Sequence, residues 1–390
     1  MGGKLKILQV SSGLDPRTGG TATAAINVAL AARRADVAVT LLYPAAPDSA
    51  ERLAPDLARL RAAGVRAIGF GFWRAGGDRA TRWAISPGLN QFLREHAGEF
   101  DVIHTHSAWV ASSVAAVRAA RRAKRPSLLM PHEALTRFDM ARGSHPALRL
   151  AKRAVRAWYL RRIDRIVVSS ELERTDSLLD DDPRVLAIPH PVLDETAPAP
   201  AAPSAPGDGL RIGFLGRLDP KKNLHRLVKA LADAPGARLI IGGDGDPAYR
   251  AELEGAVARH RVGARVTWLG FVDGAAKPEF FRNVDVVAMP SAFECFGLVA
   301  AEALGAGTPV ILSPTVGIAD LIADDDCGAI VPPRADALAA CFRRLADGVE
   351  LARWRTKARA VALARFSFAA HGAQLRAAYQ ALVDAWEPRP

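Results

Sequence analysis

PSAFECFGLVAAEALGAGTPVI, residues 290–311, is the stretch that decides the fold, because it joins a buried strand to a helix through a short loop. A predicted strand ends at Ser291, and a helix is expected to begin at Phe296 or Gly297 and to end at Gly305–Gly307. The first N–H groups of a helix bind anions, and a glycine there allows a ligand to approach closely. The backbone groups that we expect to contact a phosphate belong to Phe296, Gly297, Leu298 and Val299.

The same alternation of apolar runs and helix-length segments continues along the rest of the chain. Runs typical of buried strands lie at residues 6–12, 37–44, 65–72, 101–107, 127–132, 165–170, 184–192, 211–217, 238–245, 265–271, 284–291, 309–314 and 328–333. Strands that alternate with helices form parallel sheets covered by those helices. We therefore predict an α/β protein with two Rossmann-like, doubly wound parallel-sheet domains that face each other across a cleft. Ligands of such sheets bind at the carboxyl ends of the strands.

A proline-rich segment divides the alternation into two halves. Residues 195–209, ETAPAPAAPSAPGDG, form neither a helix nor an interior strand, because proline dominates them. A chain of 390 residues is also longer than a single core usually supports. The sequence therefore predicts an N-terminal domain over 1–194, a linker over 195–209 and a C-terminal domain over 210–365. Residues 366–390 are expected to form a helix that packs back on the N-terminal domain.

A second informative stretch is FLGRLDPKKNL, residues 214–224, in which a predicted strand ends at Gly216. Arg217 and Lys222 follow, and a guanidinium and an ammonium group at a strand end suit a diphosphate. A basic turn that only solvates the domain edge is an equally good interpretation of this stretch alone. IIGGDGD, residues 240–246, adds a strand end at Gly243 where a ligand can approach the backbone. Strand-to-helix turns also use glycine for its positive φ.

Glu294 and Glu302 are the two carboxylates of the deciding stretch. Glu302 lies in the predicted helix, where it would accept hydrogen bonds from ribose hydroxyls. Glu294 lies in the preceding loop, where it would hold sugar hydroxyls. Two ordinary surface glutamates are the structural alternative. A glycoside-hydrolysing pair is disfavoured, because residues eight apart on one helix are separated by about 12 Å, against roughly 5 to 9.5 Å in such enzymes.

Several ordered motifs of the C-terminal half resemble the family 4 retaining glycosyltransferases, which have the GT-B fold. The motifs are GRLDPKKN, IIGGDG, WLGFVD, VDVVAMPS and ECFGLVAAE followed by LGAGTPVI. The resemblance implies that Arg217 and Lys222 bind the donor diphosphate. It also implies that Glu294 contacts the transferred sugar and that Glu302 contacts the ribose.

Some positions match the family less closely. Cys295 and Asn223 stand where the family commonly or often has glycine, and neither change removes a charged contact. DPRTGGTA, residues 15–22, resembles the glycine-glycine loop that opens the family's first helix and faces the donor phosphates. The resemblance makes Gly19 and Gly20 candidates for donor binding, and a plain helix-start turn is the alternative.

MPHEALTRFD, residues 130–139, places His132 at a strand end where the family often reads His-Gly. In relatives that histidine approaches the reacting face of the donor sugar, so the resemblance implies a catalytic role for His132. A structural strand-end histidine is the alternative. Glu133 replaces the glycine and is itself a candidate to touch the acceptor. His104, His106 and His190 also lie at predicted strand ends, and we interpret them as structural or peripheral.

The formal net charge of +11 requires an anionic partner and is unevenly distributed. Residues 118–125, RAARRAKR, carry five basic residues, and residues 137–165 carry nine Arg or Lys against two Asp. Such helices suit anionic lipid head groups, a pyrophosphate-linked acceptor or nucleic acid, and a solvated helix face is an equally good interpretation.

The cysteines and the N-terminal residues indicate in which cellular compartment we expect the protein. Cys295, Cys327 and Cys341 are an odd number without a Cys-x-x-Cys pair, which favours a reducing cytoplasm over a disulfide framework or a zinc cluster. The apolar run near the N-terminus, about six residues, is shorter than a signal peptide or a membrane span requires. We expect a cytoplasmic protein, with peripheral contact to an anionic membrane surface as one possibility.

The resemblance implies a retaining hexosyltransferase. Such an enzyme would move a sugar from a UDP- or GDP-sugar to a hydroxyl of a glycan or lipid-linked glycan in polysaccharide or glycoconjugate synthesis. We expect no permanently bound cofactor and no nucleic-acid partner. We also expect no metal, because positive side chains would stabilise the departing diphosphate. Asp244 and Asp246 form an Asp-x-Asp, but their turn resembles a metal-free feature of the family.

Other functions remain open at this point. A sugar-nucleotide epimerase or a phosphorylase would keep the fold. A basic module that binds nucleic acid or a membrane surface belongs to a different class. A Rossmann oxidoreductase is disfavoured, because SSGLDPRTGG after the first strand lacks G-x-G-x-x-G.

Overall fold

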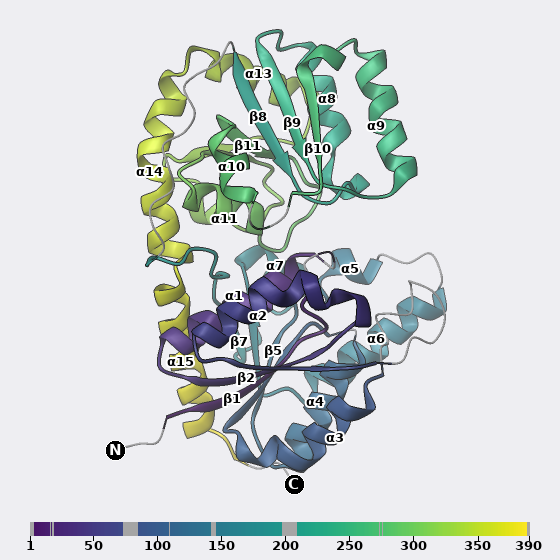
Figure 1. Cartoon of the computed structure of the whole chain (residues 1–390), viewed down its shortest axis with the longest axis vertical. Coiled ribbons are helices and arrows are strands. Elements are labelled where there is room, and N and C mark those ends of the chain that lie inside the picture. The colour runs from purple at the N-terminus through teal and green to yellow at the C-terminus, as the bar shows by residue number, and fades with distance from the viewer. Residues whose placement is uncertain are drawn as a thin grey trace. The chain divides into compact units, whose positions relative to one another are not determined.

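The computed structural model describes residues 4–15, 17, 19–72, 85–108, 110–141, 146–196, 209–272, 274 and 276–387. The chain divides into two compact units, which we call unit 1 (residues 1–191 and 368–390) and unit 2 (residues 192–367). Each unit contains one parallel sheet (Figure 1). Most of the predicted linker, residues 197–208, lies outside the described residues.

Unit 1 contains a seven-stranded sheet in the order β3-β2-β1-β4-β5-β6-β7. Its strands are β1 (Lys6–Val10), β2 (Ala38–Pro44), β3 (Arg66–Phe70), β4 (Val102–His106), β5 (Ser127–Met130), β6 (Arg165–Val168) and β7 (Val185–Ala187). Its helices are α1 (Gly20–Arg34), α2 (Ala50–Ala62), α3 (Pro87–His96), α4 (Ala111–Arg122), α5 (Arg137–Ala141), α6 (Pro146–Leu160), α7 (Glu171–Asp176) and α15 (Phe368–Asp384). Every strand pair of this sheet is parallel.

Helices cover both faces of the sheet in unit 1 because successive strand residues point to opposite sides. Ile7 of β1 packs in a cluster with α1, α2 and α15, whereas Leu8 and Val10 pack with α3 and α4. α15 lies directly on α1, and a side chain at Gly372 would overlap the carbonyl oxygen of Ala31. The last helix of the chain therefore completes the core of unit 1.

Unit 2 contains a six-stranded parallel sheet in the order β10-β9-β8-β11-β12-β13. Its strands are β8 (Leu210–Leu215), β9 (Ala237–Gly242), β10 (Val266–Gly270), β11 (Val286–Met289), β12 (Val310–Leu312) and β13 (Gly328–Ile330). Its helices are α8 (Leu224–Ala232), α9 (Pro247–Arg259), α10 (Lys277–Arg282), α11 (Leu298–Gly305), α12 (Ala319–Ile322), α13 (Ala335–Arg344) and α14 (Val349–Phe366). Ile212 and Phe214 pack with α8, α9 and α13, and Leu215 packs with α10, α11 and α14.

The two sheets confirm the predicted pair of doubly wound Rossmann-like domains. Each of the thirteen predicted runs overlaps one of the described strands. In both sheets the strand order changes direction at the first strand, between β1 and β4 and between β8 and β11. In open α/β sheets ligands bind outside the carboxyl ends of the strands at such a point.

Candidate functional site

Most of the predicted residues lie at the carboxyl edge of the sheet in unit 2. Arg217 and Lys222 follow β8, and Glu294 follows the neighbouring strand β11. The fold therefore brings the two informative stretches, which are more than 60 residues apart in the sequence, to the same part of this edge. Arg217 is exposed there, so its guanidinium is accessible to a ligand.

The glycines of this edge allow neighbouring loops to pack closely. Gly216 and Gly243 have φ angles of +150° and +133°, which favour glycine. A Cβ atom at Gly243 would overlap the carbonyl oxygen of Gly216. In the same turn, the Asp246 carboxylate accepts the N–H of Ala248 at 2.8 Å and caps α9. Loop packing and helix capping thus account for the glycine and aspartate pattern of residues 240–246.

The loop after β8 is tied to the loop after β11. Residues 220–222 form a single 3-10 turn, which Asn223 ends with a φ of +55°. Asparagine tolerates this left-handed conformation better than most residues, which explains how it can replace the family's glycine. Asn223 Nδ2 donates to Pro290 O at 2.9 Å, and Ala292 N–H donates to Lys221 O at 2.7 Å.

This connection places Lys222 against Glu294. The Lys222 Nζ atom lies 2.5 Å from Glu294 Oε1, and Lys221 Nζ lies 3.9 Å from the same oxygen. Burial alone would raise the pKa of Glu294, but the charges of Lys222 and Lys221 outweigh it and lower that pKa below its ordinary value. The Glu294 backbone is held by Thr315 and Gly317 of the loop after β12, each through one hydrogen bond of 2.9 Å. Neither residue lies in a motif that marks it as part of a site.

The helix predicted to begin at Phe296 or Gly297 begins at Leu298, as α11. Gly297 is the N-cap of α11 and has a φ of +105°. A Cβ atom at Gly297 would lie 2.6 Å from Val316 Cγ1, so both backbone conformation and packing require glycine. The N–H groups of Leu298 and Val299 belong to the first turn, where no intrahelical acceptor exists. Those groups are suited to bind an anion.

Phe296 and Glu302 are already engaged by other residues of unit 2. Phe296 is 1% exposed, and its ring packs on Phe366 at a centroid distance of 5.6 Å. Any ligand contact at this position would therefore use its backbone. Both carboxylate oxygens of Glu302 lie 2.8 Å from the Nζ atom of Lys277, on α10. Lys277 is a residue that the sequence analysis missed.

The predicted glycine loop of unit 1 lies at the start of α1. Gly19 is the N-cap of this helix and has a φ of +105°, and Gly20 is the first helical residue. Among the described residues, no atom beyond the chain neighbours would lie within 4 Å of a Cβ atom at Gly19, so its conformation rather than crowding favours glycine. Pro16 and Thr18 of the same loop lie outside the described residues.

His132 lies within a stack of histidines in unit 1, between His106 and His190. Its Nε2 atom is 2.9 Å from Nδ1 of His106, and its ring lies parallel to that of His190 at a centroid distance of 5.0 Å. His106 stacks in turn on His104, whose Nδ1 atom is 2.7 Å from the hydroxyl of Tyr379. His132 is partly exposed, whereas the other three histidines are buried. His106, which we interpreted from the sequence as structural or peripheral, is therefore the direct partner of His132.

The lowered pKa values of the stacked histidines favour the neutral ring at neutral pH. Burial is the main cause that lowers the pKa of each ring well below 6.5, and neighbouring histidines lower it further. A neutral imidazole has one N–H and one lone pair, so His106 and His132 can form a hydrogen bond without charge.

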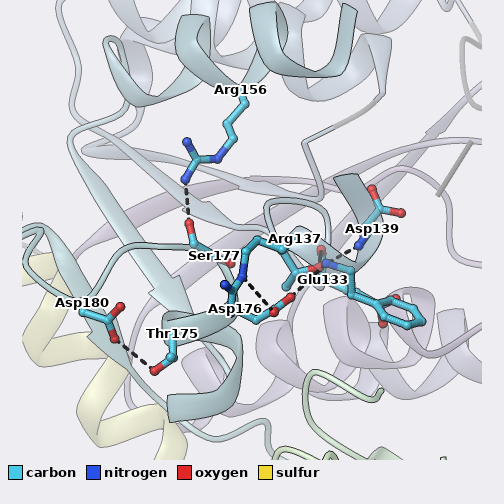
Figure 2. Close-up of polar contacts among 10 residues, drawn as sticks. Glu133, Arg137, Asp139, Arg156, Thr175, Asp176, Ser177 and Asp180 are labelled. Atoms are coloured by element: carbon cyan, nitrogen blue, oxygen red, sulfur yellow. Dashed lines mark hydrogen bonds and ion pairs between the residues drawn. The ribbon is translucent and has the colours of Figure 1, made fainter. Parts of the chain in front are cut away.

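The basic segment of residues 137–165 is partly satisfied within the fold. Figure 2 shows Arg156 directed at the Ser177 carbonyl oxygen and Arg137 directed at the Asp176 carboxylate, with distances of 2.6 Å and 3.3 Å. Both acceptors belong to the end of α7 and the residue that follows it. On α6, the exposed side chains include those of Arg149, Leu150 and Arg153.

The described residues lack two features. They contain no group of three or more His, Cys, Asp or Glu side chains placed to hold a metal ion. None of their helices combines the length and the apolar character that crossing a membrane requires.

Comparisons with known proteins gave matches for both halves of the chain. The family model for glycosyl transferases group 1 matches residues 198–361, and a model for a glycosyl transferase 4-like domain matches residues 19–189.

Individual proteins are similar over different lengths. The phosphatidyl-myo-inositol mannosyltransferase of Mycobacterium leprae is 30% identical over 355 residues, which cover 83% of this chain and 84% of the relative. An uncharacterised glycosyltransferase of Methanocaldococcus jannaschii is 37% identical over 130 residues, and the match spans 33% of each chain. The crystal structure of Anabaena HepE in complex with UDP and glucose has a TM-score of 0.76 at 21% identity, covering 97% of this chain and 100% of that chain.

Proposed function

This chain belongs to the group 1 glycosyl transferases and is a glycosyltransferase of the GT-B type, and from this premise we propose that it is a retaining hexosyltransferase. The donor would be a nucleoside diphosphate sugar, UDP- or GDP-linked, and the acceptor a hydroxyl group. The observation that carries the proposal is the Lys222–Glu294 pair of 2.5 Å at the direction change of the sheet, beside the start of α11. The UDP and glucose bound to Anabaena HepE support a UDP-sugar, and the mycobacterial mannosyltransferase supports transfer of a hexose.

In the proposed reaction the positive charges of unit 2 stabilise the leaving group. Arg217, Lys222 and the first N–H groups of α11 would bind the diphosphate as its bond to the anomeric carbon breaks. Because Glu294 holds Lys222 in place, the ammonium group is already oriented before the donor binds. We propose that these groups replace a divalent metal at the diphosphate. A phosphate oxygen of the leaving group would accept the proton of the acceptor hydroxyl on the same face of the sugar.

His132 of unit 1 would serve the same reaction as a neutral hydrogen-bonding group. Its lowered pKa means that the ring carries no charge at neutral pH. A neutral imidazole can bind a sugar hydroxyl without repelling the positive anomeric centre of the transition state. The loop at Gly19 and Gly20 would contribute backbone contacts to the donor phosphates.

Nucleotide binding tests the roles of Glu302 and Lys277. We expect Glu302→Ala to weaken binding of free UDP or GDP about tenfold, because a charged hydrogen-bond acceptor for the ribose is lost and Lys277 is left without its partner. Lys277→Ala should weaken binding less, because Glu302 itself remains. Glu279→Ala, on the same helix as Lys277, is the control. Isothermal calorimetry gives the three affinities, and equal affinity in wild type and Glu302→Ala would contradict the assignment.

We propose a glycan or lipid-linked glycan as the acceptor, at the cytoplasmic face of an anionic membrane, in polysaccharide or glycoconjugate synthesis. The exposed Arg149, Leu150 and Arg153 of α6 support this part, because basic and apolar side chains on one helix bind lipid surfaces. Arg149→Glu/Arg153→Glu should reduce co-sedimentation with phosphatidylglycerol vesicles at least about tenfold. Lys229→Glu/Arg259→Glu, an equal charge change in unit 2, is the control. Equal loss of binding in both double variants would show that net charge alone attracts the protein.

A further inference from the structure

The backbone at His132 and Glu133 is held in an unfavourable conformation. Two consecutive non-glycine residues have positive φ angles there, +49° at His132 and +76° at Glu133. Each left-handed residue without glycine costs roughly 1 kcal/mol or more, so a conformation of this kind persists only where surrounding contacts enforce it. The family often has glycine at the second position, which would adopt this φ without strain. The structure must therefore contain groups that enforce it in this chain.

Glu173, on α7, supplies such a contact. Its side chain is 1% exposed, and its Oε1 atom accepts the N–H of Glu133 at 2.8 Å. Its Oε2 atom accepts the N–H and the hydroxyl of Ser169, each at 2.7 Å. On the other side of the strained residue, the carbonyl oxygen of Glu133 accepts the N–H and the hydroxyl of Thr136 at 3.0 Å and 2.6 Å. Both peptide groups of Glu133 are thus fixed.

The placement of Glu173 is itself costly. Burial raises the pKa of Glu173, and the hydrogen bonds from Ser169 and Glu133 only partly oppose that effect. Among the ion pairs of the described residues none includes Glu173, so neutral donors alone stabilise its carboxylate. The buried carboxylate of Glu173 and the strained dipeptide of His132 and Glu133 are both unfavourable, and they are in direct contact. A shared functional role would explain why both are present.

We propose that Glu173 is a positioning residue, which holds the left-handed backbone of His132 and Glu133 and thereby directs the His132 ring toward the sugar. This inference rests on the proposed function of His132. α7 supports the same segment at a second point, because the Asp176 carboxylate accepts the N–H of Phe138 at 3.0 Å. Figure 2 shows the end of α7 beside the segment that carries Glu133 and Arg137.

The test combines two substitutions. Glu173→Gln has nearly the same shape, but its amide offers one acceptor and one donor to groups that all donate, so either Glu133 or Ser169 loses its acceptor. Glu133→Gly removes the need for the anchor, because glycine adopts positive φ on its own. If Glu173 acts through residue 133, the double variant should recover what Glu173→Gln loses. Asp176→Asn is the control, since it weakens an anchor of the same segment that glycine at 133 cannot replace.

We expect Glu173→Gln to lower kcat about 100-fold, with little change in the KM for the donor, because a displaced catalytic group costs about this much. Glu133→Gly should raise the Tm of unit 1 by about 2–4 °C, and the kcat of this variant is the reference for the double variant. Glu173→Gln/Glu133→Gly should recover most of the kcat that Glu173→Gln loses. Asp176→Asn/Glu133→Gly should recover none of the kcat that Asp176→Asn loses. A double variant as impaired as Glu173→Gln, or an unimpaired Glu173→Gln, would overturn the inference.

Failure of the proposed function would appear differently, as absence of sugar transfer by the wild-type protein itself. The unfolding temperatures then decide the inference. A Glu173→Gln substitution that lowers Tm clearly with Glu133 present, and by less than half as much with glycine at 133, supports the contact between the two residues as the anchor. Equal loss of Tm in both backgrounds would overturn it.

Discussion

Lys222→Ala is expected to lower kcat/KM for the nucleotide sugar by about 100- to 1,000-fold, the effect of removing one preorganised charge from a developing anion. The Lys222 ammonium is held 2.5 Å from Glu294 and is backed by Lys221 at 3.9 Å from the same oxygen. An ammonium group oriented before the reaction needs no reorganisation as charge develops on the diphosphate. Steady-state kinetics of nucleotide release measure the loss. A variant with the full wild-type rate would show that the diphosphate binds elsewhere.

Loss of stability must be separated from loss of transition-state binding in this variant. Glu294 is 14% exposed, and removing its partner leaves a largely buried charge, which costs up to about 3 kcal/mol. Lys222→Ala/Glu294→Gln removes both charges, so the double variant should recover stability without recovering the rate. Lys229→Ala, an exposed lysine of α8 in the same unit, should change neither. Recovery of the rate in the double variant would contradict a role for Lys222 at the leaving group.

Acidification is expected to unfold unit 1 between about pH 6 and pH 5. Five buried or partly buried histidines of this unit have lowered pKa values: His104, His106, His132, His190 and His371. The pKa of His371 falls to about 4 because burial outweighs its hydrogen bond to Pro189 O. Below the ordinary pKa of 6.5 the unfolded chain binds protons that the folded rings do not, so stability is complete above pH 6.5 and falls as the pH is lowered.

The expected loss is large because the five effects add. Each neutral ring contributes roughly 1 kcal/mol of lost stability for every pH unit below 6.5, against a total stability of about 5–15 kcal/mol for a typical domain. The groups that face the stack are themselves neutral at these pH values: Tyr379 of α15, whose pKa burial raises, and Gln9 of β1.

Urea unfolding at pH 7.5 and at pH 5.5, followed by circular dichroism and tryptophan fluorescence, measures this effect. We expect a much lower midpoint at pH 5.5. His190→Asn should reduce the pH dependence, because it removes one titrating ring at a position where the family often has asparagine. Equal midpoints at the two pH values would show that the histidines are protonated in the folded protein or exposed to solvent.

The sequence was sufficient for the fold because the periodic signals were strong. Each predicted strand run overlaps a described strand, and the start of α11 at Leu298, directly after Gly297, follows from the glycine and the apolar pattern after it. The approach of Lys222 to Glu294 was also implied, since both follow neighbouring strands. The carboxyl ends of parallel strands meet at one edge of the sheet.

Contacts between side chains that are far apart in the sequence could not be predicted from periodic patterns. Lys277 reaches Glu302 from a helix 25 residues earlier, and nothing in its surroundings marks it. Glu173 contacts Glu133 only because α7 follows β6, the neighbour of β5, and its sequence resembles an ordinary helix start. The His106–His132 pair was within reach of sequence reasoning, because both histidines lie at the ends of adjacent strands.

The most direct test of the central claim is transfer itself, measured with a panel of UDP- and GDP-hexoses in the presence of EDTA. Nucleotide release is followed for each donor, and the coupling constant of the anomeric proton in the product is read by NMR. We expect release from a selected donor without added metal, loss of that release in Lys222→Ala, and an anomeric configuration equal to that of the donor. Release that requires a divalent metal, or a product of inverted configuration, would contradict that claim.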